Sequence, residues 1–369
     1  MSYLSPFVIV SHVVSHAVTE GFIPAVQQLG YPVVLLTDQK REHSRVLSGE
    51  VSVIECDVFN PMAILDTLTD KGICPVAIFS NSDHLQTATA IVAKTLGLPG
   101  KDWKICYAAK QKWQMRQRLA TLNLPSVWSR QLLPGSLPDA SWPWPLVVKP
   151  VQGVASMNVR LAENPQQLAG IVKSYDSRQT LLLEQFIEGP LFTLETLGDG
   201  DSLIAVGGFD VELSEPPHFV ETGARWEGEY ACRWRQQALS QLREFGVKFG
   251  VCHSEFIATP SGPVLVEINY RSIGDGREFL LDSILPSGWF TPILQIYLGK
   301  PAPTVLPSSA SAVIHYVVAE KEGILQQLPA PSPAPGVCWR PLKQAGDTVR
   351  LTHSNKDYLG VLCLQADSR

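Results

Sequence analysis

The sequence contains, at residues 252–269, the stretch CHSEFIATPSGPVLVEIN, in which two largely apolar runs flank the turn residues TPSG. Apolar runs joined by a short turn with Pro and Gly predict an antiparallel β-hairpin. With Ser261 at its centre, the hairpin places Glu255 opposite Glu267 and His253 opposite Asn269. Charged side chains therefore face each other where a sheet normally pairs opposite charges or apolar groups.

Side chains of a strand alternate between its two faces, so Arg271 joins the polar face of this hairpin. We expect the opposite face to be apolar, with Phe256, Val264, Val266 and Ile268. Opposed carboxylates on the polar face repel unless a positive charge lies between them, and carboxylate and amide oxygens suit Mg²⁺ that holds substrate phosphates. The alternative is a solvated face whose carboxylates pair with Lys or Arg, and a bulge near the turn would change the register.

Lys149 ends the apolar run Leu146–Lys149 and precedes the small-residue loop PVQGVASMNV at residues 150–159. Backbone N–H groups of such a loop can bind anionic oxygens, so the lysine and the loop together suit a nucleotide phosphate. The alternative is a lysine that extends to solvent from the end of a strand without a function.

The first ~100 residues alternate between short apolar runs and helix-compatible segments. The predicted strands are 7–10, 33–36, 51–54 and 76–79, and the predicted helices are 18–29, 61–71 and 83–96. This repetition predicts a doubly wound α/β domain. The G-x-G-x-x-G turn of a dinucleotide fold is missing, so nothing supports cofactor binding through that turn.

Beyond this domain the predicted elements are mixed. One basic helix is predicted over Tyr107–Leu122, and it carries Lys110, Lys112, Arg116 and Arg118. The other predicted elements are a helix at 165–175, strands at 181–184 and 192–196, a helix at 232–249, a linker at 301–309 and a β-rich tail at 311–365.

The composition excludes several classes of protein. Of 369 residues, 45% are hydrophobic and 18% charged, which is typical of a globular chain and not of a disordered one. Thirty Lys and Arg against 35 Asp and Glu give a net charge of −5 without a dense basic run, which disfavours nucleic-acid binding. No apolar stretch approaches the roughly 18 residues of a membrane span, and the N-terminus lacks the basic start of a signal peptide. The seven cysteines are widely spaced, so we expect reduced, mostly buried thiols in a cytoplasmic protein.

The order of the motifs resembles the ATP-grasp superfamily, and within it the carboxylate–amine ligases typified by L-amino acid ligases. The resemblance covers roughly residues 7–300 and rests on the ordered set, because each motif alone is weak. These motifs are AAKQKWQMRQRL, LVVKP, PVQGVASMNV, LLLEQFIEGP, PHFVETG and HSEFIATPSGPVLVEINYRSIG.

The resemblance implies an α/β protein with the ATP-grasp fold, an N-terminal doubly wound α/β domain and a small β-rich C-terminal region. The implied divisions are an N-terminal α/β domain at 1–105, a central ATP-grasp subdomain at 106–188, a C-terminal ATP-grasp subdomain with the metal site at 189–300, and a β-rich cap at 301–369.

The resemblance also implies an ATP site between two α/β subdomains. The implied nucleotide-binding residues are Lys112 and Lys149 on the phosphates, Gly153 and Ser156 in the loop that covers them, Glu184 on the adenine amino group, and Phe186 and Ile187 in the hinge beside the base. Glu255, Glu267 and Asn269 are the implied ligands of Mg²⁺, with two ions expected and Mn²⁺ able to substitute.

The resemblance further implies that Arg271 and Asn269 are catalytic, with Arg271 steadying the phosphoryl group and the acyl phosphate. The implied contacts with the organic substrates are His218, Glu221 and Gly274. The alternative for segment 218–223 is an ordinary surface loop. Further candidates for the pocket wall, without individual roles, are Arg225, Trp226 and Arg277.

Two positions depart from the pattern of related ligases. Leu191 stands where a Glu commonly holds the ribose hydroxyls, and Asn158 stands where many members have Gly. A nearby polar group would have to replace the ribose contact.

These features predict an ATP-dependent ligase that joins a carboxylate and an amine through an acyl phosphate and releases ADP and phosphate. Specialised metabolism, such as dipeptide or siderophore biosynthesis, is the expected setting, and a homodimer is a further expectation. The alternatives are an ATP-dependent carboxylase that uses bicarbonate, in keeping with the β-rich tail, and a non-catalytic ATP-binding regulator, in keeping with Leu191.

Overall fold

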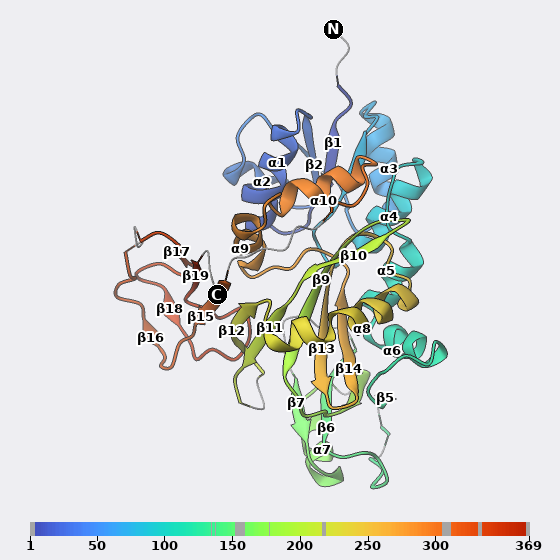
Figure 1. Cartoon of the computed structure of the whole chain (residues 1–369), viewed down its shortest axis with the longest axis vertical. Helices are drawn as coiled ribbons and strands as arrows, with labels where there is room; N and C mark the ends of the chain where they lie inside the picture. The colour runs from blue at the N-terminus through green and yellow to red at the C-terminus, as the bar shows by residue number, and fades with distance from the viewer. Residues whose placement is uncertain are drawn as a thin grey trace.

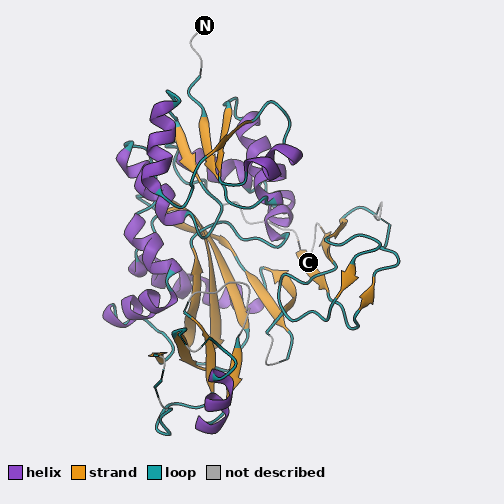
Figure 2. Cartoon of the chain, turned by 180° about the vertical axis from the view of Figure 1, so that it is seen from behind, coloured by secondary structure: helices purple, strands orange, loops and turns teal. Residues whose placement is uncertain are grey.

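The structure, a computed structural model, describes residues 4–133, 135–136, 138–151, 159–176, 178–215, 219–304, 311–330 and 334–366. A parallel N-terminal sheet lies at one end, a small antiparallel sheet lies at the other, and a long antiparallel sheet connects them (Figure 1). Helices flank the N-terminal sheet on both sides and continue along one side of the long sheet (Figure 2).

The N-terminal sheet is parallel and has the strand order β3-β2-β1-β4. Its strands are β1 (Phe7–Val10), β2 (Val33–Thr37), β3 (Ser52–Glu55) and β4 (Ala77–Phe79). Its helices are the π-helix η1 (Ala17–Phe22), α1 (Ile23–Gln28), α2 (Lys40–Val46), α3 (Pro61–Asp70) and α4 (Gln86–Thr95). The doubly wound α/β prediction is confirmed. Helix α2 was not predicted, because its mostly polar sequence KREHSRV has no apolar periodicity.

The N-terminal sheet shares its core with a late part of the chain. Helix α9 (Arg277–Ile284) and helix α10 (Phe290–Tyr297) lie in the chain between two strands of the long sheet, and α10 lies across the N-terminal sheet in Figure 1. The ring of Phe290 packs edge-on against Phe22, with centroids 4.9 Å apart. The N-terminal part therefore does not complete its hydrophobic core without residues beyond 277.

The predicted basic helix Tyr107–Leu122 is wrong as a single element. The structure has two helices, α5 (Trp103–Lys110) and α6 (Lys112–Thr121), separated by Gln111, whose extended backbone (φ −87°, ψ 100°) ends one helix and begins the next. No sequence signal marks the break, because neither Gly nor Pro occurs there. The break re-aims α6, which brings Lys112 and Arg116 to the hairpin.

The small antiparallel sheet has the order β5-β8-β6-β7. Its elements are β5 (Ser129–Leu132), β6 (Leu146–Pro150), β7 (Arg160–Ala162), α7 (Pro165–Val172) and β8 (Leu181–Gln185). Val147 lies opposite Glu184, and Lys149 lies opposite Leu182. Lys149 and Glu184 are therefore diagonal neighbours on one face of this sheet.

The long sheet has the order β14-β13-β9-β11-β12-β15-β19-β17, and β10 also pairs with β9. Its strands are β9 (Leu191–Asp199), β10 (Leu203–Gly207), β11 (Phe209–Leu213), β12 (Glu221–Trp226), β13 (Phe249–Thr259), β14 (Gly262–Asn269), β15 (Ser311–Val317), β17 (Val337–Pro341) and β19 (Gly360–Ala366). Helix α8 (Glu229–Phe245) packs on this sheet. It ends before the predicted Phe249, because Gly246 with φ +109° stops the helix.

The predicted hairpin is confirmed at its charged end. Glu255 pairs with Glu267, and His253 pairs with Asn269. A β-bulge then shifts the register, so that Phe256 pairs with Leu265.

The bulge overturns part of the predicted apolar face. The fully buried face carries Phe256, Leu265 and Ile268, whereas Val264 and Val266 are only half-buried. Val266 is the extra residue of the bulge, so every side chain between it and the turn changes face.

The β-rich tail is confirmed, but its main strands extend the long sheet. Strand β15 pairs with β12, and β19 pairs with both β15 and β17. Among the described strands of the tail, only the short β16 (Gly323–Ile324) and β18 (Thr348–Val349) pair separately from it. The sheet thus runs across the predicted boundary at residue 300, and the four sequence-based divisions remain a prediction.

The seven cysteines all lie in the described ranges, and none forms a disulfide. The prediction that they are mostly buried is wrong, because Cys74, Cys232 and Cys338 are exposed. Wide spacing along the chain does not reveal which face of a helix or strand a thiol occupies. In the described part of the chain, every helix is too short or too polar to cross a membrane.

We predict that Phe256→Ala lowers the free energy of unfolding by about 3–4 kcal/mol, because it leaves a cavity in a packed core. Phe256 is fully buried and its ring stacks on Phe192, with centroids 5.4 Å apart. Urea denaturation followed by circular dichroism measures the loss. The exposed Ile324 provides the control, since Ile324→Ala should change the free energy by less than about 0.5 kcal/mol. Equal effects of the two variants would contradict this packing.

Candidate active site

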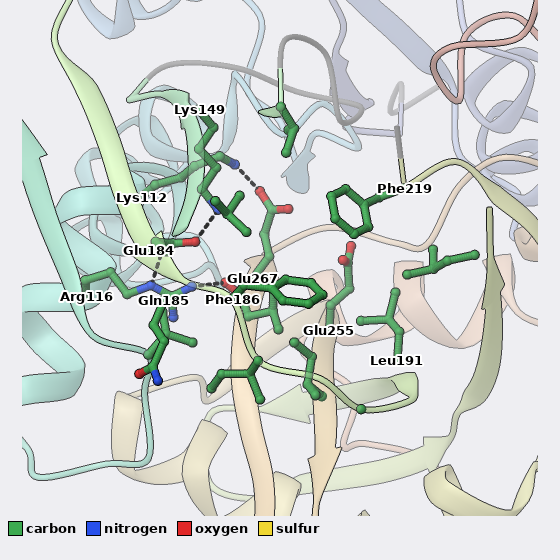
Figure 3. Close-up of a pocket in the computed structure, with 18 of the residues that line it drawn as sticks. Lys112, Arg116, Lys149, Glu184, Gln185, Phe186, Leu191, Phe219, Glu255 and Glu267 are labelled. Carbon is green, nitrogen blue, oxygen red and sulfur yellow. Dashed lines mark hydrogen bonds and ion pairs between the residues drawn. The ribbon is translucent and has the colours of Figure 1, made fainter. Parts of the chain in front are cut away.

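A cavity of about 340 Å³ lies between the small sheet and the hairpin of the long sheet. Lys149 and Glu184 enter it from the small sheet, Glu255 and Glu267 from the hairpin, and Lys112 from α6 (Figure 3). The apolar part of the wall includes Phe186, Ile187, Leu191, Leu213, Phe219 and Ile257. The cavity wall therefore combines charged and apolar side chains.

The structure brings together most of the residues predicted for a nucleotide site. Those that line the cavity are Lys112, Lys149, Glu184, Phe186 and Ile187. Gly153, Ser156 and His218 lie outside the described residues, as does Asn158. Leu191 lines the cavity, so an apolar side chain occupies the wall where related ligases commonly have Glu.

Two cations hold the buried Glu184 carboxylate. Arg116 Nε donates to Oε1 over 2.7 Å, and Lys149 Nζ lies 2.5 Å from Oε2. Burial by itself would raise the pKa of Glu184, but the two cations outweigh it and lower the pKa to about 2. Burial lowers the pKa of Lys149, and Glu184 opposes that shift. Glu184 is thus ionised and fixed in position.

Arg116 is a site residue to which the sequence analysis assigned no role. It is 2% exposed, and its Nη1 and Nη2 donate to the carbonyl oxygens of Leu265 and Val266 over 2.8 and 2.9 Å. These two consecutive carbonyls lie at the bulge in β14, which is an edge strand. One signal was available: Arg116 lies beside Met115, one turn before Leu119, among the buried positions of α6.

The predicted metal ligands lie on the two strands of the hairpin. Their carboxylates, from Glu255 and Glu267, point into the same cavity (Figure 3). Lys112 forms an ion pair with Glu267, and the amide nitrogen of Asn269 donates to Oε1 of Glu255 over 3.2 Å. Burial would raise the pKa of Glu267, but Lys112 and then Lys149 lower it to about 2.

This donor set fits Mg²⁺, which commonly uses one or two carboxylates and takes its other ligands from water and substrate phosphates. Among the described residues, no group of three or more His, Cys, Asp and Glu side chains has the arrangement of a protein-only metal site. The sequence left two alternatives, a metal site and a face whose carboxylates pair with Lys or Arg. In the described part of the chain, Glu267 pairs with a lysine and Glu255 pairs with none, so each alternative describes one of the two carboxylates.

His253 is a second site residue without a predicted role. Its Nδ1 lies 2.8 Å from Oε1 of Glu195, and its Nε2 lies 3.5 Å from Oε1 of Glu255. Burial would lower the pKa of His253, but Glu195 and Glu255 raise it to about 9. A buried cation therefore lies beside the proposed metal ligand Glu255. The hairpin register placed His253 on this face, but Glu195 comes from β9 and had no sequence signal.

Asn269, Arg271 and Gly274 are not among the described residues that line the cavity. The Arg271 guanidinium donates from Nη1 to the carbonyl of Ser272 over 2.7 Å, and the backbone carbonyl of Arg271 accepts from the amide of His253. A catalytic role for Arg271 would require its side chain to turn toward the phosphates.

Glu221 lines the cavity and forms an ion pair with Arg277 over 2.9 Å. Burial raises the pKa of Glu221, and Arg277 opposes the shift. Of the other candidates for the wall, Trp226 is buried against Phe209 and Arg225 is exposed, so neither lines the cavity.

Comparison with known proteins identifies the fold that carries this cavity. Residues 109–275 match the family model described as an ATP-grasp domain. The chain belongs to the ATP-grasp superfamily. It is an ATP-dependent ligase of the class that forms carbon–nitrogen bonds, and enzymes of this superfamily use ATP with Mg²⁺.

Three relatives of this ATP-grasp protein illustrate the similarity. The D-alanine–D-alanine ligase of Halorhodospira halophila is 25% identical over an aligned length of 276, gaps included, and the alignment covers 70% of this chain and 87% of that protein. Dapdiamide A synthase of Enterobacter agglomerans is 23% identical over an aligned length of 310, and the alignment covers 75% of this chain and 70% of that protein. The crystal structure of an L-amino acid ligase from Bacillus licheniformis shares the fold, with a TM-score of 0.79 and 17% identity over 100% of this chain and 95% of that one.

The charge of Glu184 in this ATP-grasp protein predicts a pH dependence of stability. Its pKa is lowered in the folded state, so its stabilising contribution is complete above its ordinary pKa near 4.3 and is lost as the pH falls toward 2. Between pH 5 and pH 3, we expect the wild type to lose on the order of 1–2 kcal/mol more unfolding free energy than Glu184→Gln.

Urea titrations at several pH values measure this difference. The exposed Glu50→Gln, which removes a carboxylate far from this ion pair, serves as the matched control and should follow the wild type. A Glu184→Gln curve parallel to the wild-type curve would contradict the assigned ion pairs.

Proposed function

We propose that the protein is a carboxylate–amine ligase that makes an amide through an acyl phosphate. The observation that carries the proposal is the pair of opposed carboxylates, Glu255 and Glu267, in one cavity with the half-buried cations Lys112 and Lys149. Such carboxylates suit a divalent cation, and such lysines neutralise phosphate oxygens. The cavity therefore suits a nucleoside triphosphate with its metal.

In this proposal the adenine lies beside Phe186 and Ile187, and Glu184 accepts from its amino group. Arg116 keeps Glu184 in place from the other side, because it binds Oε1 and leaves Oε2 to Lys149. When ATP binds, the ammonium group of Lys149 would therefore move from the Glu184 carboxylate toward the phosphates. Gly153 and Ser156 are proposed to cover those phosphates.

Glu255, Glu267 and Asn269 are proposed to hold Mg²⁺, with two ions expected. The ion would supply positive charge to the phosphate oxygens at the reacting end of ATP. Lys112 neutralises part of the charge of Glu267, which prevents two bare carboxylates from facing each other before the ion arrives. Arg271 is proposed to steady the transferred phosphoryl group.

The described part of the cavity offers no activated protein nucleophile. The hydroxyl of Ser214 donates to the carbonyl of Glu215 and accepts from the amide of Val220, so it is engaged in its own turn. Cys252 is buried beneath the sheet, and burial raises its thiol pKa to about 12. The attacking group is therefore proposed to be the substrate carboxylate.

In the first step, an oxygen of the substrate carboxylate bonds to the γ-phosphorus, the bond to the β–γ bridging oxygen breaks, and ADP leaves. In the second step, the amine attacks the acyl carbon and loses a proton, and phosphate leaves with one oxygen of the original carboxylate. His218, Glu221 and Gly274 are proposed to contact the organic substrates. A dipeptide-like product of specialised metabolism is the proposed outcome.

An ADP-release screen of carboxylate and amine pairs, with products identified by mass, tests the proposal. Release that requires both partners and yields an amide supports it. Release that requires bicarbonate would identify a carboxylase, and ATP binding without turnover for any pair would identify a regulator. Either of these results would refute the proposed ligase.

We predict that Glu267→Gln abolishes turnover and changes the free energy of unfolding by less than about 1 kcal/mol. The amide is a poor ligand for Mg²⁺, but it still accepts from Lys112 and no longer repels Glu255. ADP release at saturating Mg²⁺ and urea denaturation measure the two quantities. Glu244→Gln, an exposed change on α8, is the control and should retain full activity. Activity of Glu267→Gln close to that of the wild type would remove Glu267 from the metal site.

We predict that a substrate carboxylate labelled with heavy oxygen transfers one labelled atom to the released phosphate. The transfer follows because the carboxylate attacks phosphorus and the amine later displaces the whole phosphate. Mass spectrometry of the phosphate detects the label, and unlabelled carboxylate in labelled water provides the control. Release of AMP, or of unlabelled phosphate with amide formation, would rule out the acyl phosphate.

A further inference from the structure

A segment close to the C-terminus holds one wall of the cavity. The amide nitrogen of Asn355 donates to Oε1 of Glu221 over 3.2 Å, and the backbone N–H of Glu221 donates to Oδ1 of Asn355 over 3.2 Å. The hydroxyl of Tyr358 donates to the backbone carbonyl of Glu221 over 2.8 Å. Asn355 and Tyr358 of the tail therefore form hydrogen bonds with the side chain, the N–H and the C=O of Glu221 in β12.

The other oxygen of the same carboxylate faces Arg277. Its Oε2 lies 2.9 Å from Nη1 of Arg277, which is 3% exposed. The guanidinium carbon lies 6.0 Å from the ring centroid of Tyr316, and Tyr316 stacks on Tyr358 with centroids 4.5 Å apart. Tyr358 thus binds the backbone of Glu221 directly, and it reaches Arg277 only through the ring of Tyr316.

Glu221 lines the cavity together with Glu255. If its partners were removed, this carboxylate would leave its present position, because an unpaired carboxylate in the protein interior is energetically costly. Arg277 alone leaves Oε1 of Glu221 without a donor, whereas Asn355 supplies one. The direction of this carboxylate in the cavity thus depends on the tail.

We infer that Asn355 and Tyr358 are positioning residues for the amine substrate. They act indirectly, because they hold Glu221 in the cavity wall. An ionised carboxylate accepts hydrogen bonds and does not donate them, so Glu221 suits the N–H groups of the amine substrate better than the carboxylate of the other substrate. The inference rests on the proposed ligase function. It assigns part of the substrate site to a region outside the ATP-grasp domain match at 109–275.

The test measures the KM values of ATP, carboxylate and amine in the ADP-release assay, with the most active pair from the screen. Asn355→Ala and Tyr358→Phe should each raise the KM of the amine by about five- to tenfold, because each removes a hydrogen bond to Glu221. The KM values of ATP and of the carboxylate should change by less than about twofold. Tyr358→Phe keeps the ring that stacks on Tyr316, so it remains informative if Asn355→Ala folds poorly.

Thr352→Ala is the matched control in the same segment. Its hydroxyl accepts from the amide of Ala319 over 2.8 Å and does not bind Glu221. This variant should lower the thermal midpoint as much as the test variants but leave the KM of the amine within about twofold of the wild type.

A double-mutant cycle with Glu221→Gln separates positioning from general destabilisation. If Asn355 acts through Glu221, Asn355→Ala should change the KM of the amine far less in the Glu221→Gln background than in the wild type. Additive effects, equal effects on all three KM values, or an equal effect of Thr352→Ala would overturn the inference. Failure of the proposed function would differ, because the wild type itself would release no ADP with any pair, and the inference would then fall with it.

Discussion

The buried Arg116 guanidinium connects the two sheets that form the cavity. It binds Glu184 on the small sheet and two consecutive carbonyls, those of Leu265 and Val266, at the bulged edge of the long sheet. Buried ionic networks are stable only when every member has its partners, so the two sheets are held at one separation. The width of the cavity and the place of Lys149, which shares Glu184, depend on this single cation.

The same arrangement manages the charge of the cavity. Glu184 is neutralised from two sides, and Glu267 pairs with Lys112. Within the described ranges, Glu255 has no Lys or Arg partner and receives the amide of Asn269 and the more distant ring of His253. The remaining negative charge is thus concentrated on the hairpin, where a bound cation would neutralise it. The apolar residues of the wall lower the local dielectric, which strengthens the interactions of this charge.

The cavity is assembled from segments that lie far apart in the sequence. Helix α6, strands β6 and β8, and the hairpin supply the charged groups, and the tail reaches β12 through Asn355. Helix α10 returns to the N-terminal sheet, where it completes the core. Continuity of the long sheet from β14 to β17 explains why the tail can act on the cavity although it follows the matched domain.

The sequence by itself determined most of the local elements, because their apolar periodicity and turn residues are local properties. It also determined the hairpin, but the register next to the turn pairs Phe256 with Leu265 and would place Glu255 opposite Val266, so the pairing of Glu255 with Glu267 needs the bulge. Only the tertiary structure decided the break at Gln111, the bulge at Val266 and the partners of Arg116, because each depends on contacts between distant segments. The hydrogen bonds between Asn355 and Glu221 join residues 134 positions apart, and no local pattern encodes a contact at that separation. Tertiary packing therefore converts a recognisable set of motifs into one cavity with a defined charge.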